Sequence, residues 1–412
     1  MIKDTLKKIK GFVINLSHKS LFGKISLTVT ISCCATYLLV LVVFLIPHFG
    51  VVSQAWLYLF MDYVKIDDVD TNLLFNKALQ GLQSSLLDSS VSISEGIIDS
   101  VLESIDDPHT KYLTPQSYGN YTDHISGSFK GIGVWIAVDN DENLVVIAPI
   151  PGSPANTAGI KAGDHILEID GQPTKGITTL EAGGLIRGEI GTEVELLILR
   201  DNQITEIISV SRAEVEVPSV TAEEIEEDIV YVKLYSFSSN SGSEFIEVVD
   251  RFLDAETVGI IVDIRDNPGG VVRECVQITS QFLAEGDDVL HQVDGNFKIQ
   301  NTDSSIRSEL EIKPDVRVAI LQNDRSASAS EIFAGALQDL RQNSAIIGTS
   351  SFGKGSVNYI RELMDGSALI ITFSYWTTPN GRYIAESKIM PDIAVDDEEA
   401  LMDAALSYIK NI

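Results

Sequence analysis

Three apolar runs in the second half of the chain, each followed by an amphipathic stretch, restrict the fold more than any other feature of this sequence. The runs are VYVKLYSF, VGIIVDIRD and VRVAILQND, which have the length and β-branched content of buried strands. The stretches that follow them are SEFIEVVDRFLDA, VRECVQITSQFLAEG and SEIFAGALQDLRQ, with apolar residues at helical spacing. This alternation predicts a mixed α/β domain with a substantially parallel sheet over residues 213–395, followed by a C-terminal helix over 396–412.

Short β-rich runs between residues 127 and 212 alternate with Gly, Pro and Asn turns, and they predict a compact, mostly β module. Within this module, Gly131 and Gly133 flank Ile132 immediately before a strand that begins near Val134. Glycines at such positions let backbone N–H groups converge on a carboxylate. For this motif alone, ordinary hairpin turns are the simpler interpretation.

An uncharged run of 23 residues, 25–47, is long enough to cross a bilayer. It exceeds the apolar core of a signal peptide and no small-residue cleavage pattern follows it, so the sequence predicts a retained transmembrane anchor. Six lysines and one acid precede residue 48, which leaves 24 of the 30 basic and 58 of the 59 acidic residues, a balance of −34. This asymmetry predicts a cell-membrane protein with a basic cytoplasmic head over 1–24 and a periplasmic or otherwise extracytoplasmic body. So acidic a body argues against nucleic acid as a partner.

Residues 73–118 combine a helical part with a turn-rich part. Apolar residues recur at helical spacing up to Ile105, which predicts two short helices, and the stretch DDPHTKYLTPQSY is typical of a connector. The helices could pack on the body or on a second subunit, so a homodimer is one of two alternatives. Cys275 stands alone in the body, on an expected helix, and is interpreted as a small buried side chain. The chain has no HExxH or CxxC motif and no His, Asp or Glu cluster at ligand spacing, so we predict neither a metal site nor a cofactor.

Three alternating serines, Ser326, Ser328 and Ser330, follow the third strand where a helix begins, at the sheet edge where open α/β domains bind ligands. Ser328 and Glu331 fit a capping box, which by itself would give the serine a purely structural role. Free N–H groups at a helix N-terminus can also hold the oxyanion of an acyl transfer, so the same serine is a candidate nucleophile. None of the six histidines is nominated by its position as the base.

Lys354 lies between two glycines in the turn GTSSFGKGSV and is the candidate base. The ordinary pKa of a lysine, about 10.4, must fall by roughly two units before the neutral amine is available, and burial in an apolar cleft acts in this direction. A third segment, DIRDNPGG, places Gly269 and Gly270 at another strand end. These glycines form either a tight turn or a source of oxyanion donors.

The order of an anchor, a β module containing GSPANTAGIKAGDHILEIDG, the segment DIRDNPGG, and the pair SASASE and FGKG resembles the C-terminal processing peptidases, also called tail-specific proteases. The resemblance extends from Asp106 to Pro391. It implies a serine endopeptidase in which Ser328 is the nucleophile and Lys354 is the general base. The implied oxyanion donors are the backbone N–H groups of Ala329 and of Gly269 or Gly270. Arg265, Glu331 and Asp339 fall on positions that the family associates with activity or with integrity of the site.

The β module is similar to a PDZ domain, which implies that a protein tail binds by strand addition. The C-terminal carboxylate of that tail would lie on the loop formed by Gly131, Ile132, Gly133 and Val134. The apolar strand beside that loop favours substrates with free tails that end in small or apolar residues.

Two positions depart from the family's pattern. Asn358 stands where a glutamine that orients the lysine is usual, and it is therefore counted with the catalytic residues. Lys388 stands where glycine is usual.

Two other functions are alternatives. GTSSFGK matches the first part of a nucleotide-binding P-loop, but Gly355 replaces the Ser or Thr that would hold magnesium, and a strand-like segment follows in place of a helix. A PDZ adaptor or chaperone built on an inactive protease is the other alternative, and Asn358 is its only indication.

Overall fold

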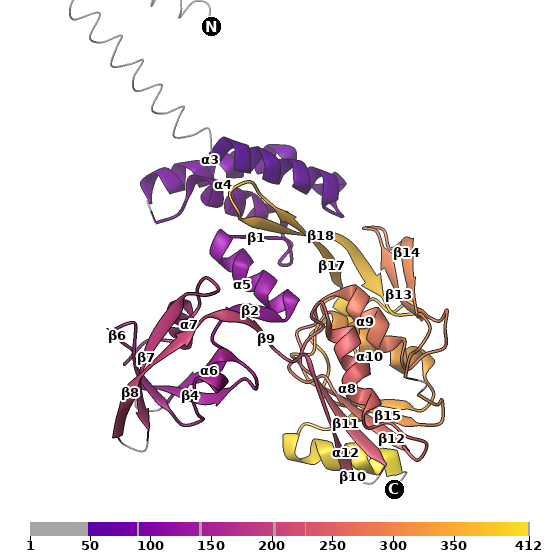
Figure 1. Ribbon diagram of the computed structural model, residues 1–412. Helices are drawn as coiled ribbons and strands as arrows, with labels where there is room; N and C mark the ends of the chain where they lie inside the picture. Colours follow the sequence, from indigo (N-terminus) through magenta and orange to yellow (C-terminus); the bar gives the residue numbers. More distant parts are fainter. Residues whose placement is uncertain are drawn as a thin grey trace, which may run out of the picture. The chain divides into compact units, whose positions relative to one another are not determined.

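The computed structural model describes residues 48–410 except 89, 140–141, 201–202, 227 and 311 (Figure 1). The predicted head and anchor over 1–47 therefore lie outside the described residues. Among the helices of the described part, none is both long enough and apolar enough to span a membrane. The chain divides into two compact units. The first comprises residues up to Pro115 together with Asn358–Thr372, and the second comprises Gln116–Val357 together with Phe373–Ile412.

The first unit is mainly helical. A helix covers residues 48–62, and it is followed by η1 (Ile66–Asp68), α3 (Thr71–Leu87), α4 (Ile93–Leu102), η2 (Glu103–Ile105) and β1 (Lys111–Leu113). α3 and α4 pack so closely that a Cβ on Gly81 would lie 2.2 Å from the carbonyl oxygen of Gly96, which requires glycine at this position. Both helices lie where the sequence predicts helices. β1 lies in the stretch predicted to be a connector, where it pairs with residues 368–370.

The β module forms the first part of the second unit, after α5 (Pro115–Ser126). Its sheet has the order β3-β4-β5-β7-β8, with β6 beside β5, and β2 pairs with β9 separately. The strands are β2 (Ser128–Gly131), β3 (Val134–Val138), β4 (Leu144–Pro149), β5 (His165–Ile169), β6 (Gln172–Pro173), β7 (Glu193–Arg200), β8 (Gln203–Ser211) and β9 (Ala213–Glu216). The short helices α6 (Pro154–Thr157) and α7 (Thr179–Ile186) contribute Ala155 and Ala182 to its core. β3, which follows the Gly131–Gly133 loop, is therefore an edge strand.

The α/β domain has a six-stranded sheet in the order β10-β11-β12-β15-β16-β19, in which every neighbouring pair except β10 and β11 is parallel. The strands are β10 (Val220–Glu226), β11 (Ile229–Leu234), β12 (Gly259–Asp263), β15 (Arg317–Gln322), β16 (Ser344–Gly348) and β19 (Ile393–Ala394). α8 (Ser241–Asp250), α9 (Val272–Thr279) and α10 (Ala329–Leu340) pack on one face, and α12 (Glu398–Lys410) packs on the other (Figure 1). The predicted mixed α/β domain is confirmed, and its carboxyl strand ends carry the SASASE and DIRDNPGG segments.

A second sheet supplies the remaining strands. β13 (Asp288–Val293) and β14 (Ile299–Ser304) form a hairpin, and β13 also pairs with residues 375–377 of β18 (Ala368–Thr377). β17 (Ser356–Glu362) pairs with β18, so that both strands have residues in each unit. α11 (Ile384–Ser387) follows β18.

Candidate active site

Ser328 occupies the turn between β15 and α10. Its backbone angles, φ 56° and ψ −115°, are ones that residues other than glycine rarely adopt. Residues held in such regions cost about 1–3 kcal/mol each and cluster at functional sites. The two serines that flank it have structural partners: the Ser326 hydroxyl donates to the Ile264 carbonyl at 2.8 Å and the Ser330 hydroxyl donates to the Asn267 carbonyl at 2.9 Å. Both are fully buried, whereas Ser328 is only half-buried. The geometry therefore favours the middle serine as the reactive one.

The buried carboxylate of Glu331 joins the Ser328 turn to the Lys354 turn. Its Oε2 accepts the backbone N–H of Ser328 at 2.8 Å and that of Lys354 at 2.9 Å. Its Oε1 accepts the Gly353 N–H at 2.6 Å and the Ser351 hydroxyl at 2.5 Å. Because one oxygen binds both amides, the main chains of the two proposed dyad residues lie side by side. Glu331 thus does more than cap α10.

The Lys354 segment is also held from its other side. The indole Nε1–H of Trp376 donates to the Lys354 carbonyl at 2.9 Å, and the Trp376 backbone N–H donates to the Gly355 carbonyl at 3.0 Å. A Cβ on Gly355 would lie 2.8 Å from the backbone nitrogen of Ala385, so only glycine fits against α11. Trp376 is a site residue that the sequence reasoning missed. The segment that contains it, YWTTPNGR, lies within the range of the family resemblance, but no local pattern marks the tryptophan as part of the site.

The Gly-Gly pair lies directly against the Ser328 turn. A Cβ on Gly269, where φ is 98°, would lie 2.8 Å from the Ala329 nitrogen and 2.8 Å from the Ser328 Cβ. The Gly269 N–H is already engaged, because it donates to Asn267 Oδ1 at 2.9 Å. Within the described part of the chain, the N–H groups of Gly270 and Ala329 have no hydrogen-bond acceptor. Of the two glycines, Gly270 is therefore the candidate oxyanion donor, together with Ala329.

Asn267 and Cys275 stabilise this region from the interior. The fully buried Asn267 donates from Nδ2 to the Leu234 carbonyl at 2.8 Å, and its carbonyl accepts the Ala327 N–H at 3.0 Å. Cys275 is buried as predicted, its Sγ lies 3.1 Å from the Ala329 carbonyl oxygen, and burial raises the pKa of its thiol to about 12. A thiol in that state is a packing group and a weak donor rather than a nucleophile.

Arg265, one of the three supporting residues, binds the neighbouring buried carboxylate of Asp263, with Nη2 2.6 Å from Oδ2. Lys233 Nζ lies 3.1 Å from Oδ1 of the same carboxylate, and the Tyr231 hydroxyl donates to Oδ2 at 2.7 Å. Burial alone would raise the pKa of Asp263, but the hydrogen bonds from Arg265 and the charge of Lys233 outweigh it and hold the pKa below its usual value. These contacts give Arg265 a role in fixing the end of β12.

The other predicted residues have partners elsewhere. Asp339, in the last turn of α10, pairs with Arg382 and accepts the Asn380 N–H at 2.9 Å, so it fixes the turn after β18. Asn358 belongs to the first unit, where its amide donates to Thr372 Oγ1 at 3.0 Å and to the His109 carbonyl at 3.2 Å.

The predicted tail-binding loop is rigidly built. The Ile132 carbonyl accepts the Ala155 N–H at 2.8 Å, and the Gly133 carbonyl accepts the Ile150 N–H at 2.9 Å. Gly133 has φ 78°, and a Cβ there would lie 2.3 Å from the Ser153 Cβ, so glycine is required. Both carbonyls are turned toward residues 150–155, which keeps these acceptors away from an approaching carboxylate. Among the described strands, β3 pairs only with β4, which leaves its other edge for strand addition.

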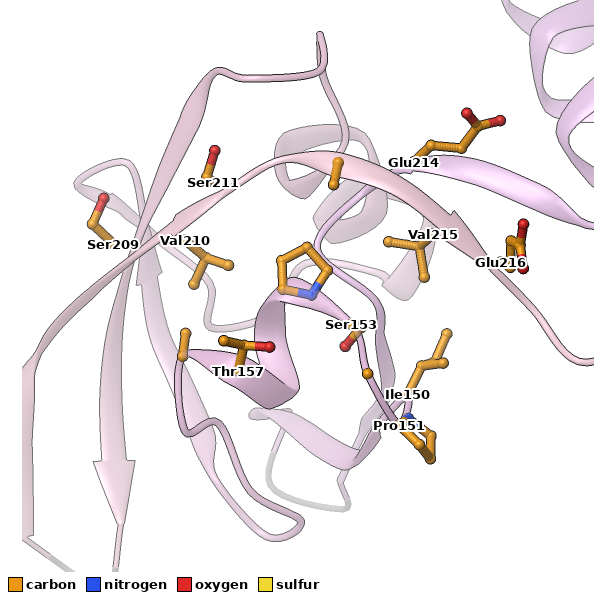
Figure 2. A pocket seen from close by; sticks show the side chains of 14 residues that line it. Ile150, Pro151, Ser153, Thr157, Ser209, Val210, Ser211, Glu214, Val215 and Glu216 are labelled. Atoms are coloured by element: carbon orange, nitrogen blue, oxygen red, sulfur yellow. The ribbon is translucent and has the colours of Figure 1, made fainter.

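A pocket of about 800 Å³ lies in the β module between α6 and the strands β8 and β9 (Figure 2). Ile150, Ser153, Val210 and Val215 line it, and Ser153 and Val215 also surround Gly133. The predicted site residues, all of which the structure describes, do not line this pocket. Its size therefore carries no argument about the reaction.

Comparison with known proteins identifies both domains. Residues 228–395 match the model of peptidase family S41, and residues 145–200 match that of the PDZ domain. The chain is 32% identical over 323 residues to the carboxy-terminal processing protease CtpA of Bacillus subtilis (strain 168), across 78% of this chain and 68% of that protein.

Two further matches agree with this family. A probable CtpA-like serine protease of Staphylococcus aureus (strain bovine RF122 / ET3-1) is 32% identical over 310 residues, across 75% of this chain and 61% of that protein, so the chain spans less than two thirds of that relative. The solved structure of a photosystem II D1 C-terminal processing protease aligns with a TM-score of 0.51 at 26% identity, across 86% of this chain and 96% of that one. The resemblance inferred from the motifs is confirmed: the chain belongs to peptidase family S41, among the PDZ-containing serine peptidases related to carboxy-terminal processing proteases.

Proposed function

We propose that this chain is a serine endopeptidase that binds the C-terminal tails of protein substrates through its PDZ domain and cleaves them with a Ser328–Lys354 dyad. The observation that supports this proposal best is the Glu331 carboxylate, whose Oε2 accepts the backbone N–H groups of both dyad residues. Two segments that are distant in sequence are thereby held together at the strand ends, beside the Gly270 N–H, which has no acceptor among the described residues. A purely structural helix cap requires none of these additional contacts.

The reaction follows from these positions. Neutral Lys354 accepts the proton of the Ser328 hydroxyl as its oxygen attacks the peptide carbonyl. The N–H groups of Ala329 and Gly270 stabilise the negative charge that develops on the carbonyl oxygen. The protonated Lys354 then gives the proton to the nitrogen of the cleaved peptide bond, and the C-terminal fragment leaves as an amine. Water finally hydrolyses the acyl group from Ser328. Asn358 would act as the residue that orients the lysine.

The substrate is a protein with a free and apolar C-terminus. Its carboxylate would be held by the N–H groups of the Gly131–Val134 loop while the tail adds to the free edge of β3. Residues 25–47 would anchor the chain in the cell membrane with residues 1–24 in the cytoplasm, so that both domains lie in the periplasm or another extracytoplasmic space.

Digestion of an unfolded test protein by the wild type, Ser328→Ala and Lys354→Ala, with the product termini read by mass spectrometry, tests the proposal. We expect internal cleavage by the wild type and none by either variant, with cleavage by the wild type declining at acidic pH as the amine of Lys354 takes up a proton. Equal cleavage by Ser328→Ala would refute the dyad.

A pair of peptides tests the PDZ role. A substrate with a free carboxylate should be cut faster than the same peptide with a carboxamide end, because only the former can occupy the loop before β3. Capture of the free-tail peptide without cleavage by the wild type would instead identify a PDZ adaptor.

A further inference from the structure

Lys388 occupies a backbone conformation that is almost exclusive to glycine, and the reaction described above gives this residue no role. It ends α11 with φ 50° and ψ 177°, a region in which any side chain is strained. Its backbone is nevertheless fixed there, because the Lys388 N–H donates to the Ile384 carbonyl at 2.8 Å. The chain therefore keeps a lysine at a position where the backbone alone favours glycine.

The residue after Lys388 belongs to the hydrogen-bond network of Glu331. The Ile389 N–H donates to Ser351 Oγ at 2.8 Å, and the Ser351 N–H donates to the Ile389 carbonyl at 3.1 Å. The Ser351 hydroxyl in turn donates to Glu331 Oε1 at 2.5 Å. The Lys388 side chain thus starts from a fixed point beside the turn that ends at Lys354.

This side chain extends over Gly353, the residue directly before Lys354. A Cβ on Gly353 would lie 3.2 Å from the Lys388 Cγ and 3.6 Å from its Cε. Ordinary bond lengths and the 3.8 Å step between Cα atoms then place the Lys388 ammonium within roughly 11 Å of the Lys354 Cα. Lys388 is exposed, and no described residue forms a hydrogen bond or an ion pair with its ammonium group. A positive charge that no neighbour neutralises is therefore held at the proposed base.

Glu331 contributes the opposite charge to the same turn. Its carboxylate is fully buried, and the four groups that donate to it are three backbone N–H groups and one hydroxyl, all uncharged. A carboxylate beside a lysine favours the protonated form of that lysine. Lys354 can act as a base only in its neutral form, so the charge of Glu331 opposes the reaction that its hydrogen bonds support.

The other side chains around the turn do not offset this charge. Trp376, from β18, does not titrate. The ring of Tyr383 lies against Gly355, where an added Cβ would be 2.9 Å from its Cε2 atom, and a tyrosine carries no positive charge. Glu386 is a further carboxylate, and it lines a pocket of about 570 Å³ beside the β13–β14 hairpin. Among these groups, Lys388 is the one that can counteract Glu331.

We propose that Lys388 is a positioning residue that acts through Lys354: its positive charge opposes that of Glu331 and favours the neutral form of the proposed base. A like charge disfavours the protonated lysine, and solvent exposure weakens this effect without abolishing it. The strained backbone agrees with such a role, since strained residues cluster at functional sites. The inference rests on the proposed function, because it concerns the base of the same dyad.

The pH dependence of kcat/KM for a quenched peptide tests the inference. Activity should rise with pH as Lys354 loses its proton. Lys388→Met keeps an unbranched stem without the charge. For charges about 10 Å apart near a protein surface, we expect this variant to shift the midpoint upward by about 0.5–1 pH unit. It should then be about three- to tenfold less active than the wild type below the midpoint and equally active on the plateau.

Three comparisons assign the shift to the charge. Lys388→Arg keeps the charge and should retain the midpoint of the wild type. Lys298→Met is the matched control, because Lys298 is exposed in the same domain at the tip of the β13–β14 hairpin, and its midpoint should also be unchanged. In about 1 M salt the difference between Lys388→Met and the wild type should shrink, because ions screen an exposed charge.

Two outcomes overturn the inference. One is a Lys388→Met variant with the midpoint of the wild type, whatever its activity on the plateau. The other is a Lys388→Gly variant whose midpoint differs from that of Lys388→Met. Both variants lack the charge, so a difference between them would assign the effect to the stem or to the backbone.

Chemical labelling separates failure of this inference from failure of the proposed function. The full chain carrying Ser328→Ala is treated with acetic anhydride at a series of pH values, and the label on Lys354 is measured by mass spectrometry. Only the neutral amine reacts, so the labelling midpoint should rise in Lys388→Met without any turnover. An unchanged labelling midpoint would refute the role of Lys388 even if the wild type cleaves proteins. A wild type that cleaves nothing while the labelling midpoint still shifts would refute only the proposed reaction.

Discussion

Replacing Glu331 by glutamine should damage both the stability and the activity of the peptidase domain. The carboxylate accepts four hydrogen bonds, two at each oxygen, from Ser328, Ser351, Gly353 and Lys354. Glutamine has nearly the same shape but only one oxygen, so its NH2 group must face one pair of donors. If the NH2 group faces Ser328 and Lys354, both of those hydrogen bonds are lost inside a fully buried site; if it faces the other pair, the Gly353 hydrogen bond is lost and the Ser351 hydroxyl must accept in place of donating.

The magnitude follows from these contacts. A hydrogen bond to a charged group contributes about 1.5–3 kcal/mol, so the loss of one or two should lower the free energy of unfolding by about 2 kcal/mol or more. In one orientation of the amide the Ser328 and Lys354 N–H groups lose their common acceptor, and in the other the Gly353 N–H next to Lys354 loses its acceptor, so the Lys354 turn is disturbed in both. A displacement of about 1 Å between reacting groups can reduce the rate about 100-fold, and we expect kcat/KM to fall by at least that factor.

Urea denaturation and cleavage of a quenched peptide measure the two effects. Glu285→Gln serves as the matched control, because it makes the same chemical change at an exposed position in the same domain and should alter neither quantity. A Glu331→Gln variant with the stability and kcat/KM of the wild type would show that the carboxylate does not hold the two turns together.

Three further perturbations test other parts of the site. Gly269→Ala should lower the free energy of unfolding by about 2 kcal/mol or more in urea denaturation and abolish peptide cleavage, because its Cβ would lie 2.8 Å from that of Ser328. Gly286→Ala is the control, because Gly286 has a similar φ of 91° with open space around it, and this variant should retain cleavage. Trp376→Phe removes the hydrogen bond to the Lys354 carbonyl and should lower kcat about tenfold with little change in KM; unchanged kcat in steady-state kinetics would show that the indole only fills space. Asp263→Asn should destabilise the domain by about 3 kcal/mol at pH 7, because Arg265 loses its buried partner. The pKa of Asp263 is lowered in the folded state, so its stabilisation is complete above its unfolded pKa of about 3.9 and is lost as the pH falls through the folded value; in urea titrations the gap between variant and wild type should shrink below about pH 4, and a gap that widens there would contradict the assignment.

The sequence predicted the features that are determined by local pattern. Buried parallel strands appear as continuous apolar runs, and β11, β12 and β15 lie where such runs were found. The SASASE and DIRDNPGG segments were expected at strand ends, and the structure brings them into contact at Gly269 and Ser328.

The features that escaped prediction depend on contacts between distant segments. β1 has only three residues, too few to show a period, and its partner strand begins at Ala368. The choice between Gly269 and Gly270 as oxyanion donor depends on the direction of the Asn267 side chain, which no spacing reveals. Trp376 lies 22 residues from Lys354, and its hydrogen bond to that residue exists only because β18 returns past the Gly355 turn.

The shared hydrogen-bond acceptor at Glu331 also has a consequence for folding, because it brings the Ser328 and Lys354 turns together only in the folded domain. Its donors come from Ser328 and from the turn that ends at Lys354, so both turns depend on one buried carboxylate. If Ser328 and Lys354 form the proposed dyad, a newly made, unfolded polypeptide carries both side chains but cannot yet hydrolyse its neighbours. In this proposal the dyad becomes active only when Glu331 is buried during folding, so folding itself prevents premature cleavage.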